Sequence, residues 1–566
     1  MTIPSPHPKL YLSQPVGDPL TNQYQIGNYE ETYKNFRLEV PERYNWAYEV
    51  FDRWGNDPAK TAIVWVGPDG ASREVTFREL GERSRRTANL LAGLGAEPGD
   101  HIFVMLPRLV EWWEVLLGCI RGRFVSVPGT TLLTTKDISY RLNAARVKIA
   151  ITDPENVDKI EAVRSECATL EKVIVVGKTP GVPSYEDLMT SASPDLPNPN
   201  NLSSDPLMGY FTSGTTGYPK MVINTHASYP IGHVITGKFW LDNRPSDLHF
   251  TISDTGWAQA AWTLFFAPWT MGAAILAWDQ RGAFDPDATL RLLEDHPVTT
   301  FFAPPTAYRM LSQTDLSKYK PKALRHCVGA GEAVNPDLID TWREGTGQHI
   351  WEGYGQTETV LVAATFPGMK HKPGSMGVVA PGFTLGIVDE DGNELPRGEE
   401  GEVAVLVKPD RPVGLFSGYF ENPEANASSF RGDWYHTGDR ASRDEDGYLW
   451  FVGRADDVII SASYRIGPFE VESAVAEHPS VAETAVVASP HEVRGQIVKA
   501  YIVLAEGYEG SSDLTKQIQD HVKNVTAPYK YPREIEYVTE LPKTVSGKIR
   551  RTELRDRELA RKRSAQ

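Results

Sequence analysis

YFTSGTTGYPK, residues 210–220, places four serine and threonine hydroxyls, two glycines and a final lysine directly after a short apolar start. Glycine lets backbone N–H groups approach an anion closely, hydroxyls donate to phosphate oxygens, and lysine supplies positive charge. The spacing differs from the GxxxxGK[ST] pattern of nucleotide-hydrolysing P-loops. Because flexible turns often have the same composition, this segment alone predicts either a phosphate-binding loop or an ordinary turn.

The sequence around this segment alternates between short apolar runs and amphipathic stretches. Buried strands are expected at 101–106, 148–153 and 172–177, and residues 78–96 carry apolar side chains at helical spacing before a glycine-rich stop. Alternation of this kind favours an α/β layer architecture. The expected fold class is therefore α/β, with layered, mainly parallel sheets and helices in a large N-terminal domain.

The pattern changes after about residue 380. Asp-Gly pairs between strand-like runs at 384–396 and 443–453 indicate hairpins, and so a β-rich subdomain. From Pro468 the order of a helix, two strands, a helix and a basic tail indicates a small, mobile α+β unit. We therefore expect two domains, residues 1–455 and 456–566, that are joined near Asp456.

Composition limits the classes of function. The net charge of −16 argues against nucleic-acid binding, which needs a basic surface, but local sites can still accept anionic small substrates. The three cysteines are far apart, so neither a disulfide framework nor a cysteine-based metal site is expected. No apolar run reaches the ~18 residues of a membrane span, and the N-terminus has no signal or transit pattern. The expected location is the cytoplasm, and both a monomer and a homodimer stay open.

The segment 210–220 resembles the phosphate loop of the adenylate-forming enzymes, which include acyl-CoA synthetases, luciferases and the adenylation domains of peptide synthetases. Further motifs of that family follow in the family's order: YGQTE (354–358), TGD (437–439), GRADD (453–457) and PKTVSGK (542–548). A closer resemblance, to the medium-chain acyl-CoA synthetases, rests on SDTGW (253–257), YRIGPFEVE (464–472) and VTAPYKYPR (525–533). The ordered motifs favour the phosphate loop over the ordinary turn.

The resemblance implies a two-step reaction that uses ATP, Mg²⁺ and coenzyme A. A carboxylic acid attacks the α-phosphate of ATP to give an acyl-adenylate and pyrophosphate, and the acyl group then passes to coenzyme A. Positive charge and fixed donors must offset the repulsion between two anions. By resemblance Lys548 contacts both the carboxylate and the α-phosphate, Glu358 binds Mg²⁺ as a hard oxygen ligand, and Thr357 contacts phosphate. These three are the predicted catalytic residues.

The family motifs also imply the other contacts with the nucleotide. Asp439 should accept hydrogen bonds from the ribose hydroxyls, assisted by Arg454, and Tyr354 should stack on the adenine. The full set predicted to bind ATP or AMP is Thr212, Ser213, Gly214, Thr215, Thr216, Gly217, Lys220, Gly331, Glu332, Glu352, Gly353, Tyr354, Asp439, Arg454 and Arg465.

The acyl pocket is predicted at Trp257, Gly329, Ala330 and Gly355, with Ala258 and Trp262 as further plausible lining. In the acetyl-specific branch of the family a tryptophan closes the pocket at the position of Gly355, so glycine implies an open floor and an acid longer than acetate or propionate. Ordinary core packing is an equal alternative for Trp257. Because a hydrophobic pocket discriminates by only ~1–3 kcal/mol per methylene, a range of medium-chain fatty acids is expected.

Other functions stay open at this point. The same motifs fit a CoA ligase for an aromatic acid, such as benzoate or phenylacetate, and an adenylating enzyme that loads a carrier protein. A non-catalytic binding protein on the same scaffold is a third alternative, which the presence of Lys548, Glu358 and Asp439 disfavours.

For the second step, the resemblance implies that Asp456 is a hinge about which the C-terminal domain rotates. Coenzyme A contacts are predicted at Ser463, Tyr464, Arg494 and Lys530. The family usually has glycine at position 463, where a serine costs ~1 kcal/mol if φ is positive. Serine at this position therefore bears on how freely coenzyme A passes.

Overall fold

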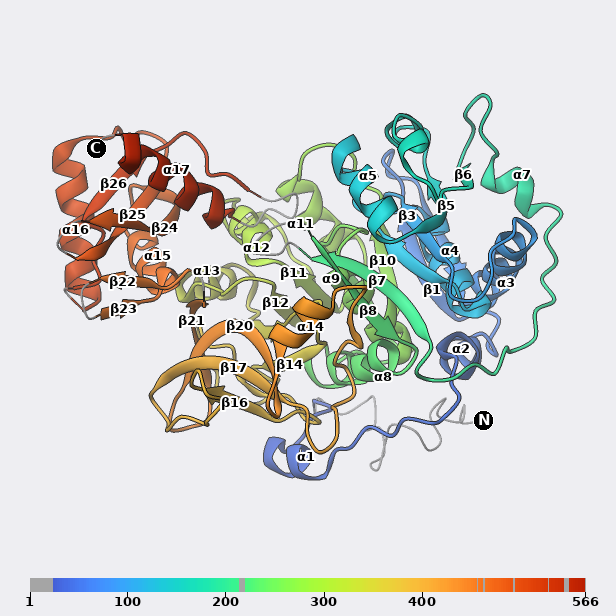
Figure 1. Cartoon of the computed structure of the whole chain (residues 1–566), viewed down its shortest axis with the longest axis horizontal. Coiled ribbons are helices and arrows are strands. Elements are labelled where there is room, and N and C mark those ends of the chain that lie inside the picture. The colour runs from blue at the N-terminus through green and yellow to red at the C-terminus, as the bar shows by residue number, and fades with distance from the viewer. Residues whose placement is uncertain are drawn as a thin grey trace.

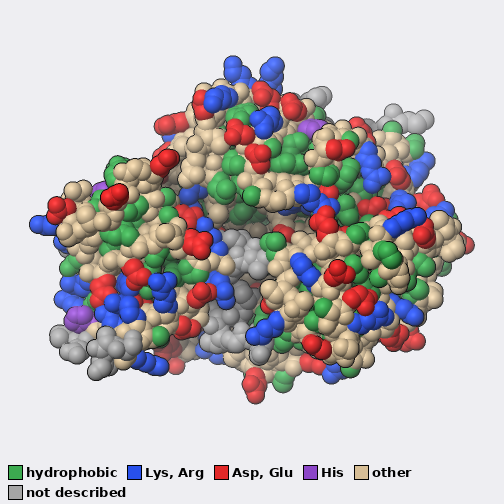
Figure 2. Space-filling view, turned by 90° about the horizontal axis from the view of Figure 1, so that it is seen from above, with side chains coloured by type: hydrophobic (Ala, Val, Ile, Leu, Met, Phe, Trp, Pro, Cys, Tyr) green, Lys and Arg blue, Asp and Glu red, His purple; other side chains and the backbone are tan. Residues whose placement is uncertain are grey.

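The computed structural model describes residues 24–212, 219–455, 457–461, 464–491, 494–527, 529–543 and 549–564. Among these residues the strands form four sheets. Three sheets build a large body, and the fourth lies in a C-terminal lobe that Figure 1 shows in red at one end of the molecule. The surface is hollowed where the lobe meets the body (Figure 2).

The first sheet of the body has nine strands, and its centre is parallel. In spatial order the strands are β15 (Val378–Val379), β14 (Leu361–Ala364), β13 (Ile350–Gly355), β12 (His326–Ala330), β11 (Thr300–Ala303), β9 (Leu248–Thr251), β10 (Ala274–Trp278), β1 (Thr61–Val66) and β2 (Ser72–Thr76). The strands from β13 to β1 run parallel, and β2, β14 and β15 pair antiparallel at the two ends.

The second sheet has seven strands and carries the predicted phosphate loop. Its order is β18 (Gly418–Tyr419), β8 (Lys220–Thr225), β7 (Pro206–Thr212), β4 (Val125–Pro128), β3 (His101–Met105), β5 (Val147–Thr152) and β6 (Lys172–Val175). The strands from β7 to β6 run parallel, whereas β8 and β18 are antiparallel additions at one edge.

Helices cover these sheets and fill the space between them. They are α1 (Tyr29–Asn35), α2 (Asp52–Trp54), α3 (Phe77–Gly93), α4 (Val110–Gly122), α5 (Thr135–Ala144), α6 (Val157–Glu161), α7 (Tyr185–Met189), α8 (Ser228–Ile235), α9 (Ala258–Ala261), α10 (Ala267–Thr270), α11 (Pro286–Asp295), α12 (Pro305–Ser312) and α13 (Pro336–Thr346). Short π-helical turns, η1 (Ala47–Phe51), η3 (Thr236–Trp240) and η4 (Trp262–Phe266), adjoin α2, α8 and α9. One apolar cluster joins both sheets through α4, α8 and η4, which are almost entirely buried.

The third sheet is small and antiparallel. It consists of β16 (Leu385–Val388), β17 (Glu400–Leu406), β20 (Trp434–Arg443), β19 (Phe430–Arg431) and β21 (Leu449–Arg454), with α14 (Pro423–Ser429) between β18 and β19. Because β20 and β21 carry the TGD and GRADD motifs, this sheet delivers both motifs to the same side of the body.

The C-terminal lobe has its own sheet and core. The sheet contains β23 (Tyr464–Ile466), β22 (Ile459–Ser461), β25 (Gly495–Leu504), β24 (Val481–His491) and β26 (Glu534–Tyr537), and the helices are α15 (Pro468–Ala476), α16 (Ser512–Val525) and α17 (Arg551–Ser564). An apolar cluster of its own joins the sheet to α15 and α16. None of the helices in the described part of the chain is long and apolar enough to cross a membrane.

The expected α/β class is confirmed, with small differences at the ends of elements. The strands predicted at 101–106, 148–153 and 172–177 are β3, β5 and β6, and the predicted helix 78–96 is α3. Helix α3 begins at a Thr76 cap, whose side chain accepts from the N–H of Glu79, and it ends two residues before Gly95, where φ is +97°. The capping residue and the glycine are the signals that set these ends.

A buried charge network fixes α17 to the sheet of the lobe. Lys499 on β25 lies 2.6 Å from Oε2 of Glu558 and 2.6 Å from Oε2 of Glu536, while Ser489 donates to Oε1 of Glu558 at 2.8 Å. Burial works against ionisation of Glu558, but hydrogen bonds from Arg561 and Lys499 lower its pKa to about 2. The network therefore stabilises the helix that directly follows the PKTVSGK motif.

We predict that Lys499→Met destabilises the lobe by about 3 kcal/mol, because it leaves the Glu558 carboxylate buried without its closest cation. The measurement is amide hydrogen exchange of β24 and β25 in the full chain, which should lose protection. Lys562→Met is the matched control, since Lys562 pairs with Glu534 at the surface and such pairs contribute at most about 1 kcal/mol. Equal effects of both substitutions would contradict the prediction.

Candidate active site

The predicted phosphate loop joins two strands that are paired with one another. Strands β7 and β8 pair antiparallel up to Thr212 and Lys220, and the Thr212 hydroxyl donates to the Lys220 carbonyl at 3.5 Å. Tyr140 on α5 donates its hydroxyl to the carbonyl of Pro219 at 2.8 Å, so a carbonyl just beyond the hairpin ladder is held as well. The predicted contacts that lie outside the described residues are Ser213, Gly214, Thr215, Thr216 and Gly217.

Lys220 and Glu358 come from separate motifs and meet at one aromatic side chain. The Lys220 ammonium lies 5.1 Å from the ring centroid of Tyr419, and the Tyr419 hydroxyl donates to Oε1 of Glu358 at 2.9 Å. Burial raises the pKa of the Glu358 carboxyl, and the hydrogen bond from Tyr419 opposes that rise. Tyr419 has no motif of its own, so the sequence analysis missed it.

Asp439, in the TGD motif, collects three donors. Its Oδ2 accepts from the hydroxyl of Tyr354 at 2.7 Å and from Nε2 of Gln356 at 2.6 Å, and its Oδ1 lies 3.2 Å from Nη1 of Arg454. Gln356 also donates to the carbonyl of Thr437 at 2.9 Å. The structure therefore brings together three predicted nucleotide contacts, Asp439, Tyr354 and Arg454, and adds Gln356.

The hydrogen bond of Tyr354 fixes the position of the hydroxyl end of its ring. Burial and the neighbouring Asp439 carboxylate raise the pKa of Tyr354 well above its ordinary value, so the hydroxyl stays a donor at neutral pH. Stacking of this ring on an adenine stays a prediction. Thr357 lies half-buried between Gln356 and Glu358 in the same segment.

The GAGE segment follows the carboxyl end of β12. Gly329 and Ala330 pair with Glu352 and Gly353 on β13, so the two predicted segments lie side by side. Gly331 has a φ of +100°, and a Cβ there would lie 2.5 Å from Nε2 of Gln259. A side chain at this position would be strained and would also clash, which explains the glycine. Glu332 accepts from the Thr306 hydroxyl at 3.4 Å.

The carboxylate of Glu352 is engaged within the protein. Its Oε2 lies 2.9 Å from Nε2 of His371, and its Oε1 accepts from the N–H of Gly374 at 2.9 Å. The side chain is only 3% exposed, so it anchors the 371–374 turn. A direct contact of Glu352 with the nucleotide stays a prediction.

Trp262 bounds the space beside Gly355. A Cβ on Gly355 would lie 2.7 Å from Cη2 of Trp262 and 2.4 Å from the carbonyl oxygen of Val360. The Trp262 indole donates to the hydroxyl of Tyr229 at 2.8 Å, which fixes the ring. The acyl pocket was expected to be open at Gly355. Instead, the ring of Trp262, which lies on η4 and far from Gly355 in the sequence, occupies the space beside this glycine. Trp257, the other predicted wall, is half-buried just before α9.

The predicted coenzyme A contacts lie on the C-terminal lobe. Lys530 forms an ion pair with Glu470, with its Nζ 2.6 Å from Oε2. The half-buried Arg494 begins the turn into β25. The backbone of Tyr464 and Arg465 forms β23, which pairs with β22. Three predicted residues lie outside the described residues: Asp456, Ser463 and Lys548.

The chain segments that flank Lys548 are both anchored. Lys543 and Ile549 form a β-bridge with one another, and the N–H of Arg550 donates to the carbonyl of Pro542 at 2.8 Å. Arg551 lies 2.6 Å from Oε2 of Glu472 on α15. The PKTVSGK motif is thus joined at both ends to the framework of the lobe.

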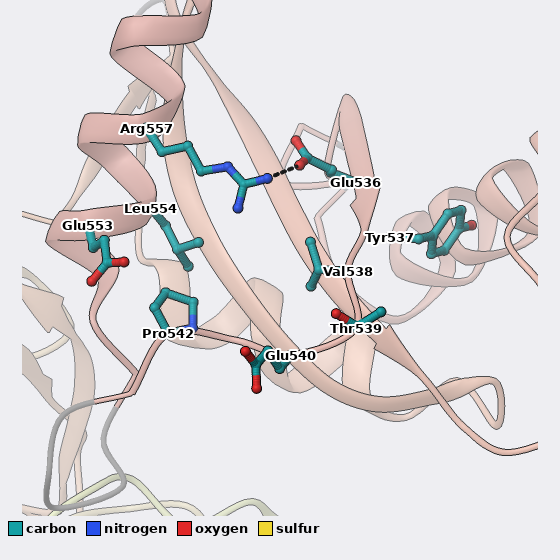
Figure 3. Close-up of a pocket in the computed structure, with 9 residues that line it drawn as sticks. All are labelled: Glu536, Tyr537, Val538, Thr539, Glu540, Pro542, Glu553, Leu554 and Arg557. Carbon is teal, nitrogen blue, oxygen red and sulfur yellow. Dashed lines mark hydrogen bonds and ion pairs between the residues drawn. The ribbon is translucent and has the colours of Figure 1, made fainter.

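A cleft of about 500 Å³ opens beside this motif, between the segment after β26 and α17 (Figure 3). Its lining includes Glu536, Glu540 and Glu553, and Arg557 is paired with Glu536 at 3.1 Å. None of the predicted site residues lines it. Because carboxylates dominate the charge of the cleft, it does not suit the phosphates of coenzyme A.

The residues present fit a magnesium ion bound together with a triphosphate. In the described part of the chain no group of three or more histidine, cysteine, aspartate or glutamate side chains could hold a metal ion. Mg²⁺ in nucleotide sites needs only one or two carboxylates, because phosphate oxygens and water complete its shell. Glu358 accepts one hydrogen bond from Tyr419 at Oε1, and an ionised carboxylate has further lone pairs for a cation.

The fold and the site together define an enzyme of the adenylate-forming class. A family model described as AMP-binding enzyme matches residues 50–420, and one described as AMP-binding enzyme C-terminal domain matches residues 470–548. The chain belongs to the AMP-binding enzyme family, which confirms the resemblance found in the sequence.

Curated relatives and a solved structure agree with this assignment. The chain is 46% identical to acyl-coenzyme A synthetase ACSM3, mitochondrial, of Rattus norvegicus, over 99% of this chain and 97% of that protein. It is 48% identical to human ACSM5, mitochondrial, over 92% of each chain. The crystal structure of the anthranilate CoA ligase AuaEII with anthranoyl-AMP matches with a TM-score of 0.85 at 32% identity, and covers 92% of this chain and 99% of that one. Both relatives are named as mitochondrial proteins, so the prediction of a cytoplasmic location gains no support from them.

We predict that Asp439→Asn weakens equilibrium binding of ATP about tenfold or more, because one acceptor oxygen becomes an NH₂ group facing the donors of Tyr354, Gln356 and Arg454. Binding to the enzyme without acid or coenzyme A is the measurement. Asp444→Asn serves as the control, since Asp444 pairs with Lys372 at 2.6 Å on the same sheet without touching the site. An Asp439→Asn variant with the affinity of the wild type would remove Asp439 from the nucleotide site.

Proposed function

We propose that the chain is an ATP-dependent acid:CoA ligase. A carboxylate oxygen attacks the α-phosphorus of ATP and expels pyrophosphate, and the thiol sulfur of coenzyme A then attacks the acyl carbon and expels AMP. One observation carries the proposal. Gln356 donates to the Asp439 carboxylate, and Glu358, two residues further on, accepts from Tyr419, whose ring lies under the Lys220 ammonium. One short segment, residues 356–358, therefore contacts both the residue proposed for the ribose and the residues proposed for the phosphates and their cation.

In the first step, Asp439 and Tyr354 hold the nucleoside, while Lys220 and Thr212 hold the phosphates. Magnesium, when bound at Glu358, offsets the charge of the phosphates. Lys548, carried on the anchored segment between Lys543 and Ile549, bridges the acid and the α-phosphate. This assignment rests on the motif and on the anchoring of its two ends.

In the second step, the lobe turns about Asp456 and presents the segment around Ser463 and Tyr464 to the site. Lys530 then exchanges Glu470 for a phosphate of coenzyme A, and Arg494 adds a second cation. A surface ion pair contributes only about 0–1 kcal/mol, so exchanging Glu470 for a dianionic phosphate is favourable.

The acid is a medium-chain fatty acid in this proposal. A Cβ on Gly355 would meet the Val360 carbonyl oxygen at 2.4 Å and the ring of Trp262 at 2.7 Å, so Trp262 bounds the pocket directly beside Gly355. The support for a medium-chain acid is the similarity of the whole chain to the ACSM synthetases. An aromatic acid is the second candidate, because the solved anthranilate CoA ligase shares the fold at 32% identity. Flat walls such as Trp257 and Trp262 suit an aromatic ring as well as an alkyl chain.

The test is release of AMP in the presence of ATP, Mg²⁺ and coenzyme A across a panel of acids. We expect medium-chain acids to exceed both acetate and benzoate, with neighbouring chain lengths separated by about tenfold or less. A preference for benzoate or anthranilate would select the aromatic alternative. AMP release that ignores coenzyme A but requires a carrier protein would overturn the ligase assignment.

The assignment of Lys548 has its own test. Lys548→Ala should abolish adenylate formation, measured as exchange of pyrophosphate into ATP, because the two reacting anions lose their bridging charge. Transfer of the acyl group from supplied acyl-adenylate to coenzyme A should stay largely intact. Lys543→Ala is the control. Lys543 belongs to the same motif as Lys548, but it pairs with Glu483 on β24 at 2.7 Å. Equal loss of both half-reactions in Lys548→Ala would sink the assignment.

Trp262 provides a test of the pocket. Trp262→Leu should shift the preference toward longer acids by one or more methylenes, each changing kcat/KM by about tenfold, because it frees the space beside Gly355. The comparison is the ratio of kcat/KM for decanoate to that for hexanoate. Trp65→Leu controls for loss of an indole, since the Trp65 indole donates to the backbone carbonyl of Arg108 at 2.8 Å and Trp65 is not among the residues that a Cβ on Gly355 would meet. An unchanged ratio in Trp262→Leu would place the pocket elsewhere.

A further inference from the structure

Tyr419 stands between a cation and an anion of the proposed ATP site. It lies on β18, which pairs with β8, the strand that begins at Lys220, and it is 8% exposed. The face of its ring carries the Lys220 ammonium at 5.1 Å, and its hydroxyl binds Glu358 at 2.9 Å. Within the described residues, Lys220 and Glu358 form no ion pair with one another or with any other partner, so Tyr419 links the two charges without letting them neutralise each other.

The backbone around Tyr419 is fixed to both partners. The N–H groups of Ser417 and Phe420 donate to carbonyls of β8 at 2.8 Å each, and that of Phe416 donates to the Glu358 carbonyl at 2.8 Å. Tyr419 therefore belongs to a segment, residues 416–420, whose backbone is hydrogen-bonded both to β8, the strand of Lys220, and to Glu358. The side chain of Tyr419 contacts the same two partners, Lys220 and Glu358.

Other lysines over tyrosine rings differ in one respect. Lys372, Lys499 and Lys530 lie 4.6, 4.5 and 5.6 Å from the centroids of Tyr448, Tyr501 and Tyr529. Each of these lysines is also paired with a carboxylate, at 2.6 Å. Lys220 has the ring, and no carboxylate in the described part of the chain pairs with it. A ring quadrupole attracts an ammonium without cancelling its charge, so Lys220 keeps its charge for an anionic ligand.

We propose that Tyr419 is a positioning residue for MgATP: its hydroxyl orients the Glu358 carboxylate toward the metal, and its ring holds Lys220 toward the phosphates. This inference rests on the proposed function. Tyr419 itself touches neither group of the substrate. The two contacts are separable, because the hydroxyl serves Glu358 and the ring serves Lys220.

Two substitutions divide these contacts. Tyr419→Phe keeps the ring and removes the hydroxyl, so equilibrium binding of MgATP, measured without acid or coenzyme A, should weaken about tenfold. Binding of ATP in excess EDTA should stay unchanged, because Lys220 keeps its ring. Tyr419→Leu should weaken ATP binding in EDTA as well, by about threefold or more, since it removes the cation–π contact. Acyl transfer from supplied acyl-adenylate to coenzyme A should match the wild type in both variants.

Tyr29→Phe is the matched control, because the Tyr29 hydroxyl donates at 2.9 Å to the carbonyl of Val379, outside the site. Equal MgATP binding by Tyr419→Phe and the wild type would overturn the inference, and so would a loss in EDTA as large as the loss with Mg²⁺. If Tyr419→Leu does not fold, Tyr419→Phe alone decides. A wild-type protein that binds no MgATP would reject the proposed function itself, which keeps the two failures apart.

Discussion

Strand β8 is hydrogen-bonded along both of its edges, and the proposed nucleotide site depends on this double pairing. One edge pairs with β7, which begins the predicted phosphate loop, and the other edge receives residues 416–420. Those residues in turn bind the main chain and the side chain of Glu358. Backbone ladders hold their partners with little freedom, so charges that lie far apart in the sequence reach a fixed separation before any ligand arrives.

The body and the lobe hold their charged groups in different ways. Asp439 is 5% exposed and bonded to three side chains from two sheets. Lys530 on the lobe has a single carboxylate partner at the surface. The buried hydrogen bonds of Asp439 cost much free energy to rearrange, whereas a surface ion pair exchanges partners with little change in free energy. Such a division suits a body that keeps one nucleotide in place while a lobe presents two different partners in turn.

Local motifs were enough to predict the α/β class, and three residues predicted from motifs to contact the nucleotide lie together in the structure. Asp439, Tyr354 and Arg454 stand in short motifs whose residue types reflect their chemistry, and the structure brings them together. The role of Tyr419 was not accessible in this way, because it follows from the pairing of β18 with β8 across a long stretch of sequence. Trp262 was expected to line the acyl pocket, but its position against Gly355 follows only from the fold, because the two residues lie far apart in the sequence. Contacts set by long-range packing carry no local signal.

The net charge of −16 makes Lys220 informative, because no carboxylate among the residues that the structure describes pairs with it. In an acidic protein most cations are claimed by nearby carboxylates, as Lys372 and Lys499 are here. A lysine that is already paired offers little field to an incoming phosphate, because its attraction to the ligand must first overcome the existing pair. Lys220 instead lies over the ring of Tyr419, which attracts the ammonium without cancelling its positive charge. In the proposed function, Lys220 attracts a triphosphate locally, against the field of the whole molecule, from the body rather than from the C-terminal lobe.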